Sequence, residues 1–127
     1  MKFITGGAYQ GKLEYAMKNY SISTAEISDG EEFSVTDLPH IKCINNYHLA
    51  IKKLLENGKN PIESTNEILA ENPNIIIIMN EIGNGIIPLE KSERIWREQV
   101  GNVGCYLAEK ADTVERIVCG VTVKIKG

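Results

Sequence analysis

The chain has 127 residues, enough for a hydrophobic core of its own, so we expect a single domain over residues 1–127. Hydrophobic residues make up 43% of the sequence and charged residues 24%, which is typical of globular proteins and excludes a disordered or fibrous chain. The net charge of -3 and the presence of only three arginines leave no basic stripe for a phosphate backbone, so nucleic acid is not an expected partner.

A strand, a loop and a helix are predicted at the start of the chain. Residues 2–5 are apolar and lead into Gly6. Apolar residues then recur at the spacing of a helix, at Leu13, Ala16, Met17 and Tyr20. Residues 21–40 are polar and poorly periodic, and we expect in them at most a short strand over residues 22–27 and a turn at Asp29-Gly30.

Two strand and helix units follow in the middle of the chain. Residues 41–45 predict a buried strand, and the helix after it should end at Gly58, a residue favoured just beyond helix ends. The motif N-P-x-E at residues 60–63 predicts the start of another helix, which should run to about Glu71. The aliphatic run over residues 74–79 is typical of a central parallel strand that is covered on both faces.

The C-terminal part predicts one long helix and two strands. Apolar residues at steps of three and four indicate a helix over residues 90–111. Residues 114–119 and 121–125 then predict two strands that meet at Gly120. The alternation of strands and helices predicts an α/β fold with a mostly parallel sheet and an antiparallel C-terminal edge strand. Ligands of such folds bind where the strands lead into the helices.

Membrane segments and cysteine frameworks are not expected. The longest aliphatic run, residues 75–79, is far shorter than the roughly 20 residues that cross a bilayer, and the start of the chain does not resemble a signal peptide. We therefore expect a cytoplasmic protein without a membrane partner. Cys43, Cys105 and Cys119 lack C-x-x-C spacing, so we expect buried thiols and no metal site.

The pattern G-x-x-x-x-G-K at residues 6–12 predicts a phosphate-binding loop. Its glycines let backbone N–H groups turn toward an anion, and Lys12, at the start of a predicted helix, would reach the outer phosphates. The alternative is that the glycines only form a tight turn after the first strand. The candidate nucleotide-binding residues of this segment are Gly6, Gly7, Ala8, Tyr9, Gln10, Gly11, Lys12 and Leu13.

The same loop lacks a group that normally binds magnesium. Leu13 stands where the pattern has a serine or threonine hydroxyl. A carboxylate is expected after the next strand, where this chain has Asn45 and Asn46, whose amide oxygens carry no negative charge. We therefore expect phosphate binding with weak magnesium binding or none.

A second candidate cluster is the segment NEIGNGIIP at residues 80–88, which follows the predicted central strand. Glu81 would then lie at the same edge of the sheet as the loop, and Gly83 and Gly85 would let the backbone approach a ligand. Lys12 and Glu81 are thus the candidate catalytic residues. The alternative is that Glu81 caps a loop and the glycines only turn.

Three motifs in order resemble the bifunctional adenosylcobinamide kinase / adenosylcobinamide-phosphate guanylyltransferase family of cobalamin biosynthesis. They are GGAYQGK, NEIGNGIIP and the stretch from RIWRE to the last residue. The resemblance implies a three-layer P-loop sandwich and a homotrimer that uses GTP or ATP. It also implies a reaction: phosphorylation of the aminopropanol arm of adenosylcobinamide, followed by GMP transfer through a histidine.

The resemblance also implies roles for individual residues. It places the loop glycines and Lys12 at the phosphates, Glu81, Gly83 and Gly85 near the nucleotide pocket, and Arg97 at the position of a family arginine. The chain departs from the family at Leu13, at Asn45 and at Gly104-Cys105, where family members have polar groups that this chain lacks.

The family segment that carries the guanylylated histidine is replaced here by a short polar connection. We expect His40 and His48 to be ordinary surface or edge histidines, so guanylyl transfer is not expected. Two functions remain open. One is a reduced kinase that phosphorylates a corrinoid alcohol; the other is a degenerate module that holds a nucleotide or a corrinoid, or only assembles with itself.

Overall fold

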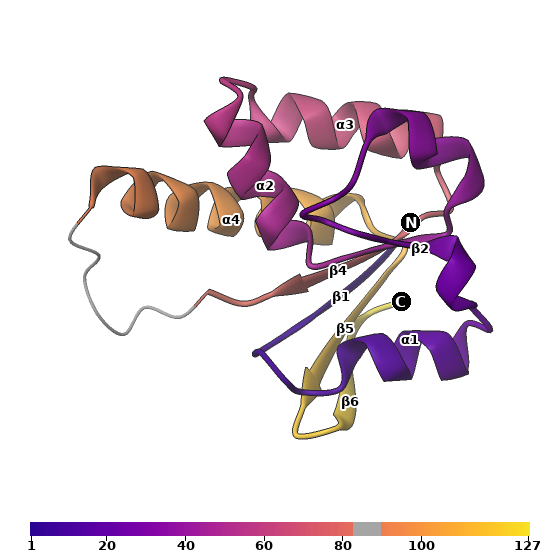
Figure 1. Ribbon diagram of the computed structural model, residues 1–127. Helices are drawn as coiled ribbons and strands as arrows, with labels where there is room; N and C mark the ends of the chain where they lie inside the picture. Colours follow the sequence, from indigo (N-terminus) through magenta and orange to yellow (C-terminus); the bar gives the residue numbers. More distant parts are fainter. Residues whose placement is uncertain (83–89) are drawn as a thin grey trace.

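A computed structural model describes residues 1–82 and 90–127 and has the predicted α/β architecture in three layers (Figure 1). Six strands form one sheet in the order β2-β3-β4-β1-β5-β6. The first five strands are parallel, and β6 is antiparallel to β5. The strands are β1 (Lys2–Gly6), β2 (Ile27–Asp29), β3 (Cys43–Asn45), β4 (Ile76–Asn80), β5 (Thr113–Val118) and β6 (Val121–Lys126).

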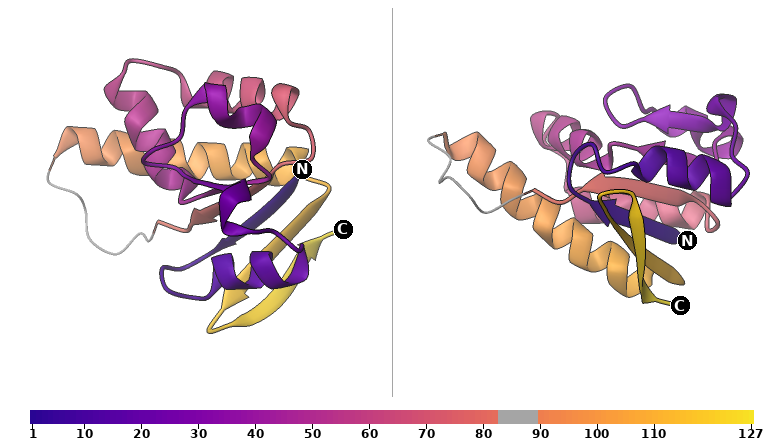
Figure 2. Two further views of the ribbon diagram at one scale, coloured as in Figure 1. Left: turned by 45° about the vertical axis from the view of Figure 1, so that its right-hand side comes forward. Right: turned by 90° about the horizontal axis from the view of Figure 1, so that it is seen from below.

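Helices cover both faces of the sheet. One face carries α1, whereas α2, α3 and α4 pack together on the other (Figures 1 and 2). The helices are α1 (Lys12–Asn19), α2 (Tyr47–Glu56), α3 (Pro61–Glu71) and α4 (Lys91–Lys110), with two short 3-10 helices, η1 (Thr24–Glu26) and η2 (Val35–His40). The start of α3 is as predicted, because the Asn60 side chain accepts hydrogen bonds from the N–H groups of Ile62 and Glu63 at 2.9 and 3.2 Å.

The expected strand over residues 22–27 is wrong. Residues 24–26 form η1, and the strand occupies residues 27–29 instead. The cause is a capping box, in which the Ser23 N–H donates to the Glu26 carboxylate at 3.1 Å while the Ser23 side chain faces the backbone of Glu26. These local hydrogen bonds turn the backbone just where the residue pattern suggested an extended chain.

The central strand β4 is buried on both faces, as predicted. Ile77 and Met79 belong to the larger apolar core under α2, α3 and α4, and Ile76 and Ile78 belong to the smaller core under α1. Burying an isoleucine side chain contributes about 1.5–3 kcal/mol to folding, so this strand is a main source of stability. It also fixes the ends of its neighbours β3 and β1, which form the candidate site.

Polar contacts fasten α1 to the sheet. The carboxylate of Glu115 on β5 is buried, with 3% of the residue exposed, and the hydroxyls of Tyr15 and Tyr20 both donate to it. The hydrogen bond to Glu115 raises the pKa of Tyr15, and burial followed by the same carboxylate raises the pKa of Tyr20. Both hydroxyls therefore stay protonated, and they hold the helix that begins at Lys12.

Two further expectations concern cysteines and the membrane. Cys43 is buried, and burial raises the pKa of its thiol to about 12. The expectation of buried thiols is wrong for Cys105, on the solvent face of α4, and for Cys119, in the turn between β5 and β6. No helix within residues 1–82 and 90–127 combines the length and the apolar character that crossing a bilayer requires.

Candidate functional site

A cavity of about 420 Å³ lies at the carboxyl ends of β3, β4 and β1. Residues 8–14 line it on the side of α1, and Asn45, Asn46, His48 and Asn80 line it from the ends of the other two strands. We call it the loop cavity. Helices α1 and α2 leave this edge of the sheet toward opposite faces, so the N-termini of both lie at the cavity (Figure 1).

The loop over residues 7–11 has a defined shape because both of its ends are fixed. Gly6 has φ 148°, and a Cβ there would lie 2.4 Å from the carbonyl oxygen of Ile117, so this strand end requires glycine. The Gln10 side chain accepts a hydrogen bond from the N–H of Cys119, and its carbonyl accepts one from Gly120 at 3.2 Å. The loop is thus held against the turn between β5 and β6.

Lys12 is the first residue of α1 and is buried, with 7% exposed. Its Nζ donates to the carbonyl oxygen of Gly7 at 2.6 Å, which places the ammonium group across the loop. Burial lowers the pKa of Lys12, while the charges of Glu81 and Glu14 oppose this shift. Among the described ion pairs none involves Lys12, so its charge has no carboxylate partner within 4.0 Å in that part of the chain.

The turn after β3 is much shorter than the loop after β1. Asn46 alone connects β3 to α2, in the left-handed conformation with φ 54°, and its side chain donates to Asp29 at 3.0 Å. The neighbouring turn packs closely against it, since a Cβ at Gly30 would lie 2.1 Å from the Asn46 carbonyl oxygen. The Gly30 N–H also donates to the Asn45 carbonyl at 2.7 Å, so the start of α2 is held from the side of β2.

His48 is not the surface or edge histidine that the sequence suggested. Only 6% of the residue is exposed, and it lines the loop cavity from the first turn of α2. Its Nδ1 accepts a hydrogen bond from the N–H of Asn80 at 3.2 Å, and its carbonyl accepts one from the indole of Trp96 at 2.8 Å. Burial, and then the charge of Lys12, lower the pKa of His48 to about 4, while Asp29 opposes the shift. The imidazole is therefore neutral at neutral pH.

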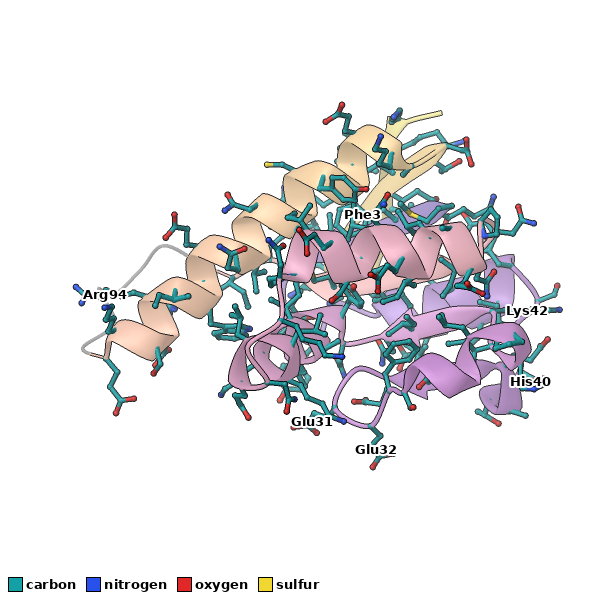
Figure 3. The ribbon with its side chains drawn as sticks, turned by 90° about the horizontal axis from the view of Figure 1, so that it is seen from above. Phe3, Glu31, Glu32, His40, Lys42 and Arg94 are labelled. Atoms are coloured by element: carbon teal, nitrogen blue, oxygen red, sulfur yellow. The ribbon has the colours of Figure 1, made fainter. Side chains whose placement is uncertain are left out.

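A weak signal in the sequence pointed to this burial. His48 precedes Ile51 by three residues, which puts both on the same face of α2, and Ile51 is fully buried. His40, in contrast, is exposed at the rim of the molecule, as expected (Figure 3).

Glu81 lies at the predicted edge, since its N–H donates to the carbonyl of Gly6 at 2.8 Å. Its carboxylate does not line the loop cavity but forms two hydrogen bonds with Arg116, from Nε at 2.7 Å and from Nη2 at 3.0 Å. Both side chains are partly exposed to solvent, by 50% for Arg116 and 39% for Glu81, so this pair contributes little to stability. Gly83 and Gly85, the other residues predicted here, lie outside the described residues.

The residues around the loop cavity do not fit a magnesium ion. Leu13 offers no oxygen and packs against the core under α1, and Asn45 offers only an amide. Glu14 supplies the one carboxylate among the described residues that line the cavity. Within the described part of the chain, no group of three or more His, Cys, Asp or Glu side chains is placed to hold a metal. The lining is therefore richer in hydrogen-bond donors than in metal ligands.

Comparison with known proteins finds one family and two relatives. The family model for cobinamide kinase / cobinamide phosphate guanyltransferase matches residues 41–125, about two thirds of the chain. The bifunctional adenosylcobalamin biosynthesis proteins CobU of Salmonella typhimurium and Escherichia coli are 40% and 38% identical over 52 residues. That stretch is 41% of this chain and covers 29% of the length of each relative. The family match includes His48 and Glu81, whereas Lys12 precedes it.

Proposed function

This chain belongs to the cobinamide kinase / cobinamide phosphate guanyltransferase family, and from that premise we propose that it binds the phosphate chain of GTP or ATP in the loop cavity. The observation that carries the proposal is the buried Lys12, whose ammonium lies across the glycine-rich loop without a carboxylate partner among the described ion pairs. A buried cation is costly unless an anion compensates it. A phosphate group in the cavity would supply that charge.

The rest of the cavity favours an anion in the same way. Helix N-termini leave backbone N–H groups without a partner in their own helix, although at α2 the N–H of Leu49 donates to the Asn46 carbonyl at 2.9 Å. Both helix dipoles also place their positive ends at the cavity. The polar side chains around these helix starts include amides, an imidazole and Lys12, and among the described lining residues Glu14 is the one carboxylate. Several phosphate oxygens can therefore be bound at once by residues 7–12 and by the start of α2.

The reaction we propose first is transfer of a phosphoryl group from the nucleotide to the hydroxyl of a corrinoid alcohol. In such transfers the protein mainly positions the reactants and neutralises charge on the moving group, and Lys12 is the residue for that role. Glu81 remains the second proposed catalytic residue, at the same edge of the sheet. Magnesium has no role in this proposal, because the residues around the cavity do not fit the ion, and guanylyl transfer is not part of the proposal.

A second candidate function is binding without turnover. It is favoured by a specific observation: Leu13 and Asn45 line the cavity where the family pattern has a hydroxyl and a carboxylate. The chain would then hold a nucleotide or a corrinoid, or only assemble with itself. The homotrimer that the resemblance implies and the cytoplasmic location expected from the sequence are part of the proposal in either case.

Thermal unfolding with added nucleotide tests the binding proposal. GTP, ATP and GDP are each added with magnesium or with a chelator, to the wild type and to Lys12→Met. At a hundred times the dissociation constant, binding stabilises the folded state by about 2.7 kcal/mol, which raises the melting temperature by several degrees. We expect this rise in the wild type under both metal conditions and little rise in the variant. No rise with any nucleotide would contradict the proposal.

Product formation separates the two candidate functions. The wild type is incubated with adenosylcobinamide and GTP or ATP, and the corrinoid is analysed by mass spectrometry. A phosphorylated corrinoid together with GDP or ADP would support the kinase. Nucleotide binding without either product would support binding without turnover. Lys12→Met serves as the control for contaminating kinases.

A further inference from the structure

The imidazole of His48 is held in one tautomer. Its Nδ1 accepts the N–H of Asn80 at 3.2 Å, and a neutral imidazole has one acceptor nitrogen and one N–H. The proton is therefore on Nε2. The residue is 94% buried, so this N–H lies where hydrogen-bond partners are few.

The Nε2 atom of His48 is accessible and has no hydrogen-bond acceptor in the described part of the chain. His48 lines the loop cavity, and no side chain or backbone group among the described residues accepts a hydrogen bond from Nε2. Among the described residues, Nε2 is also not one of the buried side-chain atoms that lack a hydrogen-bond partner, so it is not sealed inside the protein. A molecule in the cavity is therefore the available acceptor for this N–H.

The acceptor has to tolerate a cation nearby. Lys12 is close enough to His48 for its charge to disfavour the imidazolium form. The N-termini of α1 and α2 add further donors at the same cavity. A cavity that presents one cation, two helix N-termini and a neutral N–H is best suited to an anion with several oxygens.

We propose that His48 is a phosphate-binding residue whose Nε2–H donates a hydrogen bond to an oxygen of the phosphate chain held by residues 7–12. This inference rests on the proposed function and adds a contact from the opposite wall of the cavity. The contact is neutral, so it orients a phosphate oxygen without adding charge. It also accounts for a buried histidine at a position where helix packing alone would be served by an apolar side chain.

Two matched substitutions separate the roles of the two ring nitrogens. The amide nitrogen of His48→Gln lies near the position of Nε2 and keeps a donor toward the cavity, but the acceptor for Asn80 is lost. The amide oxygen of His48→Asn lies near Nδ1 and keeps that acceptor, but the donor toward the cavity is lost. Affinity for GTP and for inorganic pyrophosphate is measured by calorimetry, and folding of both variants is checked by their melting temperatures.

We expect His48→Gln to bind both probes within about threefold of the wild type and His48→Asn to bind them about tenfold more weakly, which corresponds to 1.4 kcal/mol. The reverse order would mean that His48 acts only by holding Asn80. Wild-type affinity in both variants would mean that His48 has no role in binding. Either result overturns the inference. If the wild type binds neither GTP nor pyrophosphate, the proposed function fails as well. Loss of binding by Lys12→Met alongside normal binding by both His48 variants would refute only the histidine contact.

Nitrogen-15 NMR of the wild type gives a test that needs no variant. Two-bond proton–nitrogen correlations of His48 should show the Nε2–H tautomer, and the Nε2 signal should shift when pyrophosphate is added. An Nδ1–H tautomer, or an Nε2 signal that ignores pyrophosphate while the loop amides respond, would contradict the inference.

Discussion

The two helix starts that meet at the loop cavity are built differently. Before α1 the chain uses a glycine-rich loop of five residues and places a cation, Lys12, at the helix start. Before α2 it uses a single left-handed residue, Asn46, and places a neutral imidazole, His48, in the first turn. One strand–turn–helix unit, used twice, thus gives the cavity a charged wall at Lys12 and a neutral, hydrogen-bonding wall at His48.

The supports of the two helices differ as well. On α1, the hydroxyl of Tyr15 donates to the buried carboxylate of Glu115, between the helix and the sheet. On α2, the hydroxyl of Tyr47 pairs with Thr65 of α3 at 2.7 Å, within the helical layer. The helix of the charged wall is therefore held by the buried Glu115 carboxylate, and the helix of the neutral wall by the hydroxyls of Tyr47 and Thr65.

The largest effect is expected from removing the support of α1. Glu115→Ala leaves the buried hydroxyls of Tyr15 and Tyr20 without their acceptor, and we expect the free energy of unfolding to fall by about 3 kcal/mol in urea titrations. The control is Glu115→Gln, which keeps an acceptor and should lose much less. A loss below about 1 kcal/mol in the alanine variant would mean that Glu115 does not support α1.

Removing the cation tests the charged wall itself. Lys12→Met keeps a side chain of similar length, and we expect GTP to bind about 100-fold more weakly, or about 2.7 kcal/mol, because hydrogen bonds to charged groups are the strong ones. Stability without ligand should not fall, since a buried charge is removed. Unchanged affinity would show that the two walls do not differ in the way proposed.

Acidification tests the neutral wall. The pKa of His48 is lowered from 6.5 to about 4 in the folded state, so on acidification the unfolded chain takes up a proton at this histidine first. The neutral ring therefore contributes its full share of the free energy of unfolding above pH 6.5, and this contribution is lost as the pH falls toward 4. From pH 8 to pH 5 the loss should be about 2 kcal/mol. The charged groups that act on the ring are Lys12 and Asp29. His48→Asn, measured in the same urea titrations, should lack this part of the pH dependence, and identical profiles would contradict the assignment.

The smallest effect is expected at the support of α2. Thr65→Val keeps the shape of the side chain but removes the hydroxyl that meets Tyr47, and we expect a loss of about 1 kcal/mol in thermal unfolding. Tyr47→Phe combined with Thr65→Val should restore part of the loss, because no buried hydroxyl is then left unpaired. A double variant less stable than the sum of the two single variants would argue against the pairing.

Outside residues 21–40, the order of the helices and strands could be predicted because each carries a local signal. The capping residue Asn60 fixed the start of α3, and the aliphatic run at residues 74–79 identified the central strand, although β4 itself begins at Ile76. The positions of the loop and of Glu81 at one edge of the sheet followed from the alternation of strands and helices. Such features depend on residues within a few positions of one another.

The features that could not be predicted depend on contacts between distant residues. Tyr15 and Glu115 are 100 residues apart, and His48 and Asn80 are 32 apart. The burial of His48 follows from the approach of β4 and α4, and the pairing of Glu81 with Arg116 follows from how the strand ends align. Patterns of neighbouring residues do not carry these contacts, and for His48 they give only its place on the same helix face as Ile51.

The most direct test of the account is a titration of backbone amide NMR signals with inorganic pyrophosphate in the absence of magnesium. The account predicts that the amides of residues 7–12 and those at the start of α2, residues 47–49, shift together with one dissociation constant. Shifts confined to other parts of the chain, or no shift in either helix start, would contradict the claim that the two walls hold one phosphate chain.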